Sequence, residues 1–139
     1  MTFKFEKLEV WQLAIQYVDT VYQVAEKLPR SEEFNLKSQF IRAATSIALN
    51  IAEGSTGQTD AEQARFLGLA LRSLIETVAC QRLIVRRNYL DEPTLLDLAN
   101  RQAETLAAKL HSFRKAIAPD QRWLRETDVE YTTDNGGRE

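Results

Sequence analysis

Apolar residues recur along the chain at alternating intervals of four and three, the spacing that places one stripe on one side of a helix. Four such runs occur, and prolines or glycines stand between them. The predicted helices cover residues 10–28, 36–53, 59–88 and 91–118. Their stripes are Val10, Ala14, Tyr17, Val21, Val24 and Leu28; Leu36, Phe40, Ala43, Ile47 and Ile51; Leu67, Leu71, Leu74, Val78, Gln81 and Val85; and Ala99, Ala103, Leu106, Leu110, Phe113 and Ile117.

Residues at the ends of these runs are typical of helix boundaries. Thr59 and Glu62 have the spacing of a capping box at the start of the third helix. Gly54 follows the second helix, where a glycine can adopt a left-handed cap. Because the connections are short, the sequence predicts an all-α fold, an antiparallel up-down-up-down four-helix bundle over residues 1–118.

A C-terminal tail, residues 119–139, lacks this periodicity. It contains three Lys or Arg residues against six Asp or Glu residues, whereas residues 61–118 contain nine against six. We expect the tail to be partly disordered, from about Glu126 onward, because it is acidic and polar. Trp123 is the exception, and either the bundle or a neighbouring subunit could hold it. The whole chain has a net charge of −2, which does not favour binding to a phosphate backbone.

Polar residues follow one face of the second predicted helix and meet others on the third. Two interpretations remain open: a solvated edge or hydrogen-bonded network between helices, and a ligand or catalytic site. A buried pair of Arg42 with Glu76 is the specific prediction, and it needs good hydrogen bonding to offset desolvation. The polar network or interface candidates are Gln39, Arg42, Ser46, Asn50, Glu53, Ser73 and Glu76.

The second helix also carries the motif FNLxxQxxRAAxSIxxNIAEG at 34–54. It is flanked by FxxLxVW at 5–11 and FLxxAxxSLxET at 66–77. These motifs resemble the four-helix-bundle family of 23S rRNA-intervening sequence proteins. The resemblance implies an antiparallel bundle that assembles into a ring, often of five subunits. A protein similar in fold, the accessory protein of diversity-generating retroelements, is strongly basic and binds nucleic acid and a reverse transcriptase.

The residue types that catalysis or metal binding requires are sparse. Cys80 is the single cysteine and His111 the single histidine, so we expect no metal site and no cofactor. Glu53 and Glu76 could form a carboxylate pair for acid–base chemistry, but no metal ligand or histidine accompanies them, and we expect no enzyme. Arg82, Arg86 and Arg87 could contact phosphates or could form a solvated helix end.

Charges near the N-terminus and the lack of a long apolar run predict a cytoplasmic protein without a membrane span. Two helices have more apolar residues than one stripe requires, which favours an interface. These residues are Trp11, Ile15, Val18 and Tyr22, and Phe66, Leu69, Leu83 and Ile84. We therefore predict a non-catalytic homo-oligomeric scaffold or interaction protein, a pentamer before a dimer. The alternative is a nucleic-acid-associated accessory factor with a ribosomal RNA or reverse-transcriptase partner, and a small enzyme ranks below both.

Overall fold

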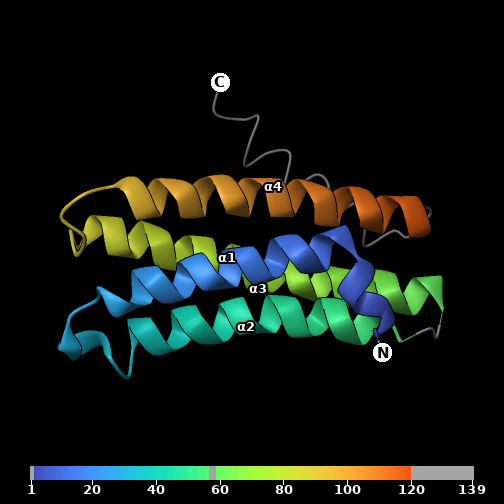
Figure 1. The fold of residues 1–139 in the computed structure, drawn as a ribbon, viewed down its shortest axis with the longest axis horizontal. Coiled ribbons are helices and arrows are strands. Elements are labelled where there is room, and N and C mark those ends of the chain that lie inside the picture. Colours follow the sequence, from blue (N-terminus) through green and yellow to red (C-terminus); the bar gives the residue numbers. More distant parts are fainter. Residues whose placement is uncertain (1, 57–58, 120–139) are drawn as a thin grey trace.

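The computed structural model describes residues 2–56 and 59–119, and within these ranges it contains helices and no strands (Figure 1). The predicted all-α fold is confirmed, whereas the predictions about Trp123 and the tail beyond Pro119 lie outside the described residues. In chain order the elements are the 3-10 helix η1 (Lys4–Lys7), α1 (Glu9–Glu26), the 3-10 helix η2 (Arg30–Glu32), α2 (Leu36–Gly54), α3 (Asp60–Arg86) and α4 (Thr94–Ile117).

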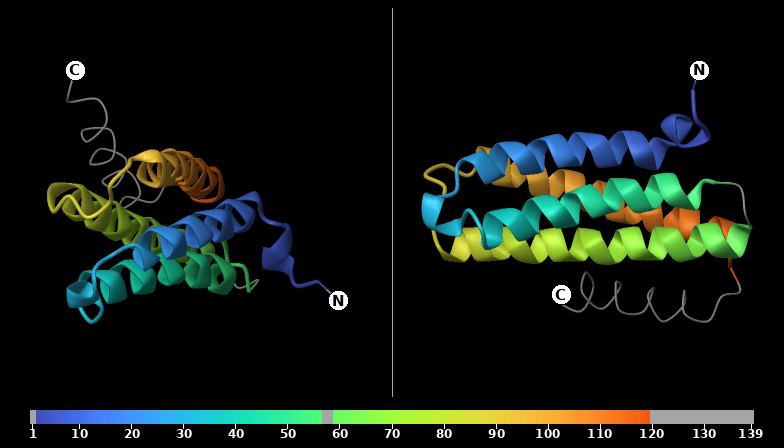
Figure 2. Two further views of the ribbon diagram at one scale, coloured as in Figure 1. Left: turned by 60° about the vertical axis from the view of Figure 1, so that its left-hand side comes forward. Right: turned by 90° about the horizontal axis from the view of Figure 1, so that it is seen from below.

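The four long helices form one bundle. Each helix packs against the next along the chain, and α4 packs against α1, so that the contacts close a cycle. Consecutive helices run in opposite directions in Figure 1, and the views of Figure 2 show all four extending along the length of the bundle. Short connections lead to this arrangement, because each helix must return beside the one before it.

Most residues of the predicted stripes form the core, whereas Val78, Phe113 and Ile117 are half-buried and the stripe shifts near the end of α3. Tyr17, Phe40 and Leu106 are fully buried, as the spacing predicts.

Val85 was predicted to be in the core and is exposed, whereas Ile84, predicted to be outside the stripe, is fully buried. The buried residues of α3 after Leu74 are Thr77, Cys80, Gln81 and Ile84, so the buried face turns around α3 toward its end. The neighbouring helices, and not the spacing along α3 alone, therefore decide which side of its last turns is covered.

One helix cap lies where the sequence predicts it, and the left-handed cap lies at a different residue. Thr59 Oγ1 accepts a hydrogen bond from the Glu62 amide at 3.0 Å, as predicted for the start of α3. The left-handed cap occurs at Asn88, with φ of 57°, and not at Gly54. The amides of Asn88 and Tyr89 donate to the carbonyls of Val85 and Ile84, at 2.9 and 3.3 Å. This pair of bonds is a Schellman motif, in which asparagine can replace glycine.

Gly54 has a packing role instead of a capping role. It is the last residue of α2 and is buried. A Cβ atom on Gly54 would lie 2.7 Å from Cβ of Phe66 in α3, closer than two such carbon atoms can approach. The prediction of a left-handed cap at Gly54 is therefore wrong, because this glycine allows α2 and α3 to pack closely at their shared end.

Replacing Gly54 with valine is expected to lower the free energy of unfolding by about 1–3 kcal/mol, since the new side chain overpacks this contact. Urea denaturation measures the effect. Adding Phe66→Ala should give no rescue of the overpacking, because alanine keeps the Cβ atom that lies at 2.7 Å. An unchanged urea midpoint for Gly54→Val would contradict the close approach.

Candidate functional site

Three of the predicted polar candidates meet between α2 and α3. Ser46 Oγ and Ser73 Oγ lie 2.9 Å apart and share a hydrogen bond across the two helices. Asn50 Nδ2 donates to the carbonyl and to the hydroxyl oxygen of Ser46, at 2.9 and 3.1 Å. All three side chains are half-buried. They form a small hydrogen-bonded contact that fixes the register of α2 against α3.

The remaining polar candidates lie outside this contact. Gln39 is exposed, and its amide donates to Asn35 Oδ1 at 3.4 Å. Arg42 precedes Ser46 by four residues on α2, and Glu76 follows Ser73 by three residues on α3. Because the two helices are antiparallel, both residues lie on the same side of the Ser46–Ser73 contact, at a similar level of the bundle. Both side chains are nevertheless exposed. The prediction of a buried Arg42–Glu76 pair is therefore wrong, since both residues lie on the solvent side of their helices.

Truncating Glu76 to alanine is expected to change the free energy of unfolding by less than about 0.5 kcal/mol, as for other exposed sites. The matched variant on the same helix is Ser73→Ala, which removes the hydrogen bond with Ser46 and should cost about 1 kcal/mol. Urea denaturation of both variants checks the contrast. A loss of several kcal/mol for Glu76→Ala would instead indicate a buried charge pair.

The two glutamates proposed for acid–base chemistry are far apart. Glu53 lies seven residues beyond Ser46 on α2, and Glu76 lies three residues beyond Ser73 on α3. Since the helices are antiparallel, these offsets point in opposite directions and separate the residues by about 15 Å along the bundle. The pair cannot act on one substrate atom within a single chain.

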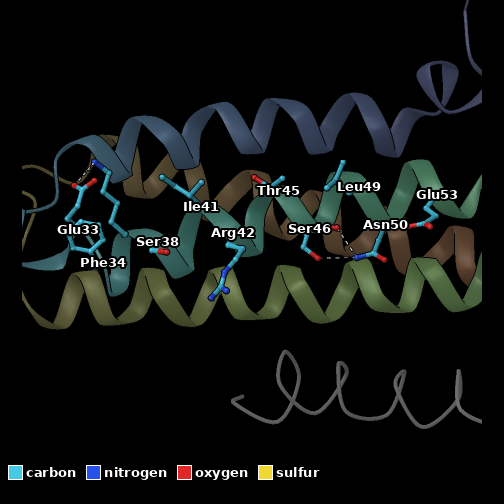
Figure 3. A pocket seen from close by; sticks show the side chains of 11 residues that line it. Glu33, Phe34, Ser38, Ile41, Arg42, Thr45, Ser46, Leu49, Asn50 and Glu53 are labelled. Atoms are coloured by element: carbon cyan, nitrogen blue, oxygen red, sulfur yellow. Dashed lines mark hydrogen bonds and ion pairs between the residues drawn. The ribbon is translucent and has the colours of Figure 1, made fainter.

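A groove of about 680 Å³ runs along the outer side of α2, and we call it the α2 groove (Figure 3). Arg42, Ser46 and Asn50 lie on its side toward α3. Ile41, Thr45 and Leu49 lie on its side toward α1. The lining residues are Glu33, Phe34, Lys37, Ser38, Ile41, Arg42, Thr45, Ser46, Leu49, Asn50 and Glu53.

Two large apolar side chains along the α2 groove are mostly in solvent. Phe34 is 95% exposed and Leu49 is 59% exposed. Neither was among the surplus apolar residues predicted from the sequence, which were assigned to the first and third helices. Of those, Trp11 packs edge-on against Phe5 of η1, with ring centroids 4.6 Å apart, whereas Tyr22 remains exposed.

The arginines proposed to contact phosphates have different surroundings. Arg82 Nη1 donates to Asn100 Oδ1 at 2.9 Å, which links α3 to α4. The Tyr89 hydroxyl donates to Glu32 Oε2 at 2.6 Å, and this bond holds the pKa of Glu32 below its usual range. Tyr89 also raises the pKa of the Arg87 guanidinium. Arg86 is exposed on the outer side of α3.

The single cysteine, Cys80, and the single histidine, His111, lie within the long helices of the bundle. Cys80 is buried, and burial raises the pKa of its thiol, which disfavours the nucleophilic thiolate. His111 is half-buried on α4. In the part of the chain that the structure describes, no three His, Cys, Asp or Glu side chains are grouped as metal ligands would be. Across 2–56 and 59–119, no helix has the length and apolar character that crossing a membrane requires.

A buried polar chain inside the core was missed in the sequence. Gln81 Nε2 donates to the Tyr17 hydroxyl, and Tyr17 Oη lies 2.8 Å from Thr77 Oγ1. Thr77 donates to the carbonyl of Leu74 at 2.6 Å, so Tyr17 is the donor in its bond with Thr77. The one signal in the sequence was the polar Gln81 within an apolar stripe, four residues after Thr77.

The bundle and the three motif segments of the sequence agree with one known family. The sequence pattern of the 23S rRNA-intervening sequence proteins matches residues 6–112, from η1 to within α4. The chain belongs to this family. The match includes the α2 groove and the Ser46–Ser73 contact, so both lie in the part of the chain that the family shares.

A solved structure has a similar fold. It is a protein of unknown function of the S23 ribosomal protein family from Bacteroides thetaiotaomicron. It is similar with a TM-score of 0.69 and 24% identity, over 76% of this chain and 98% of that chain. No curated protein matches the chain. Membership in the 23S rRNA-intervening sequence protein family therefore supports the fold and leaves the function to be argued from the surface.

Proposed function

We propose that this protein is a non-catalytic scaffold or interaction protein that acts as a homo-oligomer, with subunits meeting through the α2 groove. The exposure of Phe34 and Leu49 carries the proposal. Apolar side chains gathered along a groove with a polar rim are typical of surfaces that another protein covers. In an assembled protein these two side chains would leave solvent.

The charges along the α2 groove favour a second copy of this chain. Lys37 and Arg42 are balanced by Glu33 and Glu53, and Lys37 already pairs with Glu33 at 3.2 Å. A groove without net charge offers little attraction to a polyanion. It suits a partner that is nearly neutral, and this chain has a net charge of only −2.

We expect the assembly to be a closed ring, a pentamer before a dimer. The α2 groove is concave, so it needs a convex surface elsewhere on the neighbouring subunit. Such a heterologous contact closes into a ring when the rotation between subunits permits it. The resemblance in sequence to ring-forming proteins supports five subunits.

Self-association can be tested with two copies of the full chain that carry different affinity tags. The two copies are co-expressed, one is captured, and the other is sought in the eluate after a wash in high salt. Recovery of both copies supports the proposal, because apolar contacts survive salt. Recovery of only the captured copy in low and high salt would contradict it.

The absence of catalysis is part of the same proposal. The 15 Å offset of Glu53 and Glu76 along the bundle, from a rise of about 1.5 Å per residue, argues against a carboxylate pair. The buried Cys80 thiol argues against nucleophilic catalysis. Both observations favour a protein that acts by binding.

The nucleic-acid-associated role has one observation in its favour, the exposed arginines on the outer side of α3, which include Arg72 and Arg86. A gel-shift titration with single-stranded and structured RNA separates the two roles. We expect no retardation at physiological salt. Retardation that weakens steeply with added salt would favour the accessory role, because phosphate contacts release counterions.

A further inference from the structure

The segment before α1 carries an aromatic side chain that is largely in solvent and yet held in place. Phe3 is 61% exposed, and its ring stacks on that of Phe5 with the centroids 6.3 Å apart. Phe5 in turn packs edge-on against Trp11 of α1, at 4.6 Å. The outer ring of this stack is an apolar surface that the described part of the chain leaves mostly uncovered.

Hydrogen bonds hold residues 3–8, which we call the η1 arm, in one conformation. The Phe3 amide donates to Glu6 Oε2 at 3.0 Å, and the Glu6 amide donates to the Phe3 carbonyl at 3.0 Å. Gln12 Nε2 of α1 donates to the Glu6 carbonyl at 2.9 Å. Both views of Figure 2 place η1 outside the four long helices, where α1 begins. The arm is therefore a preorganised projection, which loses little conformational entropy when a partner covers it.

The η1 arm matches the last turns of the α2 groove in spacing and in charge. Phe3 and Lys7 are separated by about 8 Å at the rise of a 3-10 helix. Leu49 and Glu53 of the groove are separated by about 6 Å along α2. Lys7 and Glu53 are exposed, and neither forms an ion pair within residues 2–56 and 59–119. An aromatic ring and a lysine therefore complement a leucine and a carboxylate at a similar interval.

We infer that the η1 arm of one subunit fills the α2 groove of the next, with Phe3 against Leu49 and Lys7 facing Glu53. This inference rests on the proposed self-association and names the convex surface that the groove receives. A second copy is favoured as the occupant because every copy supplies one arm and one groove. In a closed ring each groove is then filled and each Phe3 covered.

Photo-crosslinking from position 3 tests this inference in the full chain. Phe3→benzoylphenylalanine keeps an aromatic side chain, and irradiation joins it covalently to groups in direct contact. Two differently tagged copies are co-expressed, and only one of them carries the probe. We expect a covalent product of both copies, in which the arm is joined to the α2 peptide that contains Leu49. The matched control is Tyr22→benzoylphenylalanine on α1, because Tyr22 is also an exposed aromatic residue and should not capture this peptide.

Phe3→Ser provides a second measurement that needs no probe. We expect it to weaken each contact between subunits by roughly thirty-fold, as for a central interface residue. Circular dichroism should be unchanged, because Phe3 is mostly exposed. Light scattering over a dilution series measures the effect, and Phe3→Ser that dissociates no more readily than the wild type would overturn the inference.

The outcomes separate this inference from the proposed self-association. Copies that co-purify without a product between the arm and the α2 peptide would overturn the inference and leave self-association standing. A product within one chain, or one that joins position 3 to another segment, would overturn it in the same way. Copies that do not co-purify would overturn both.

Discussion

Replacing Tyr17 with alanine is expected to lower the free energy of unfolding by about 3–5 kcal/mol, the range for large aromatic side chains removed from a core. Tyr17 is fully buried, and its loss leaves a cavity between α1 and α3. It also leaves the Gln81 amide and the Thr77 hydroxyl without the partner they share. Urea denaturation, followed by circular dichroism, measures the change.

Tyr17→Phe separates the hydrogen bonds from the packing. It keeps the ring, so we expect a smaller loss of about 1–3 kcal/mol, caused by buried polar groups left unsatisfied. A loss for Tyr17→Phe as large as that for Tyr17→Ala would show that packing contributes little. A value near zero would contradict the buried hydrogen-bonded chain.

The pH dependence of stability gives a second measure of the same chain. Burial raises the pKa of Tyr17 to about 12 from its usual value of 10.0. The folded protein therefore holds this proton more tightly than the unfolded protein does. The stability it contributes is present below pH 10 and is lost as the pH rises from 10 to 12. Tyr17→Phe should remove this component, and identical pH profiles for the two proteins would contradict it.

Leu49→Glu is expected to dissociate the homo-oligomer into folded monomers. A carboxylate in the α2 groove would be desolvated at each contact between subunits, and this penalty is repeated around the assembly. Substitutions at central interface residues weaken a contact by about 2 kcal/mol or more, roughly thirty-fold in affinity. Size-exclusion chromatography with light scattering measures the mass, and circular dichroism confirms that the helices remain.

The matched control for assembly is Leu83→Glu, which introduces the same charge at a residue with similar exposure on α3. We expect this variant to keep the mass of the wild type. Equal masses for Leu49→Glu and the wild type would show that the α2 groove is not the contact. Dissociation by Leu83→Glu alone would move the contact to α3.

The helices could be predicted because each one depends on local spacing. An apolar residue such as Phe40 lies in the core because the stripe of α2 has one continuous face, and the sequence alone contains that information. The start of α3 at Thr59 could be predicted for the same reason, since its cap joins two residues that are three apart in the sequence. The end of the α3 stripe was not, because the neighbouring helices decide which side of the last turns is covered, and they bury Ile84 and leave Val85 exposed.

Features that depend on how two helices pack together could not be predicted from the sequence of either helix. The hydroxyl of Tyr17 finds its partner Thr77 sixty residues later, and only the assembled bundle, in which α1 and α3 face each other across the core, brings them together. Gly54 was wrongly predicted as a cap, because its packing role depends on the distance to Phe66, which the sequence does not contain. The α2 groove was missed for the same reason, since the exposure of Leu49 depends on how α2 is rotated in the bundle.

The mass of the wild-type chain in solution shows directly whether this protein is a homo-oligomer. Light scattering should be recorded over a range of micromolar concentrations at physiological salt. We expect a mass several times the 15.9 kDa mass of one chain, with five chains as the first expectation. A mass of 15.9 kDa at every concentration would contradict it.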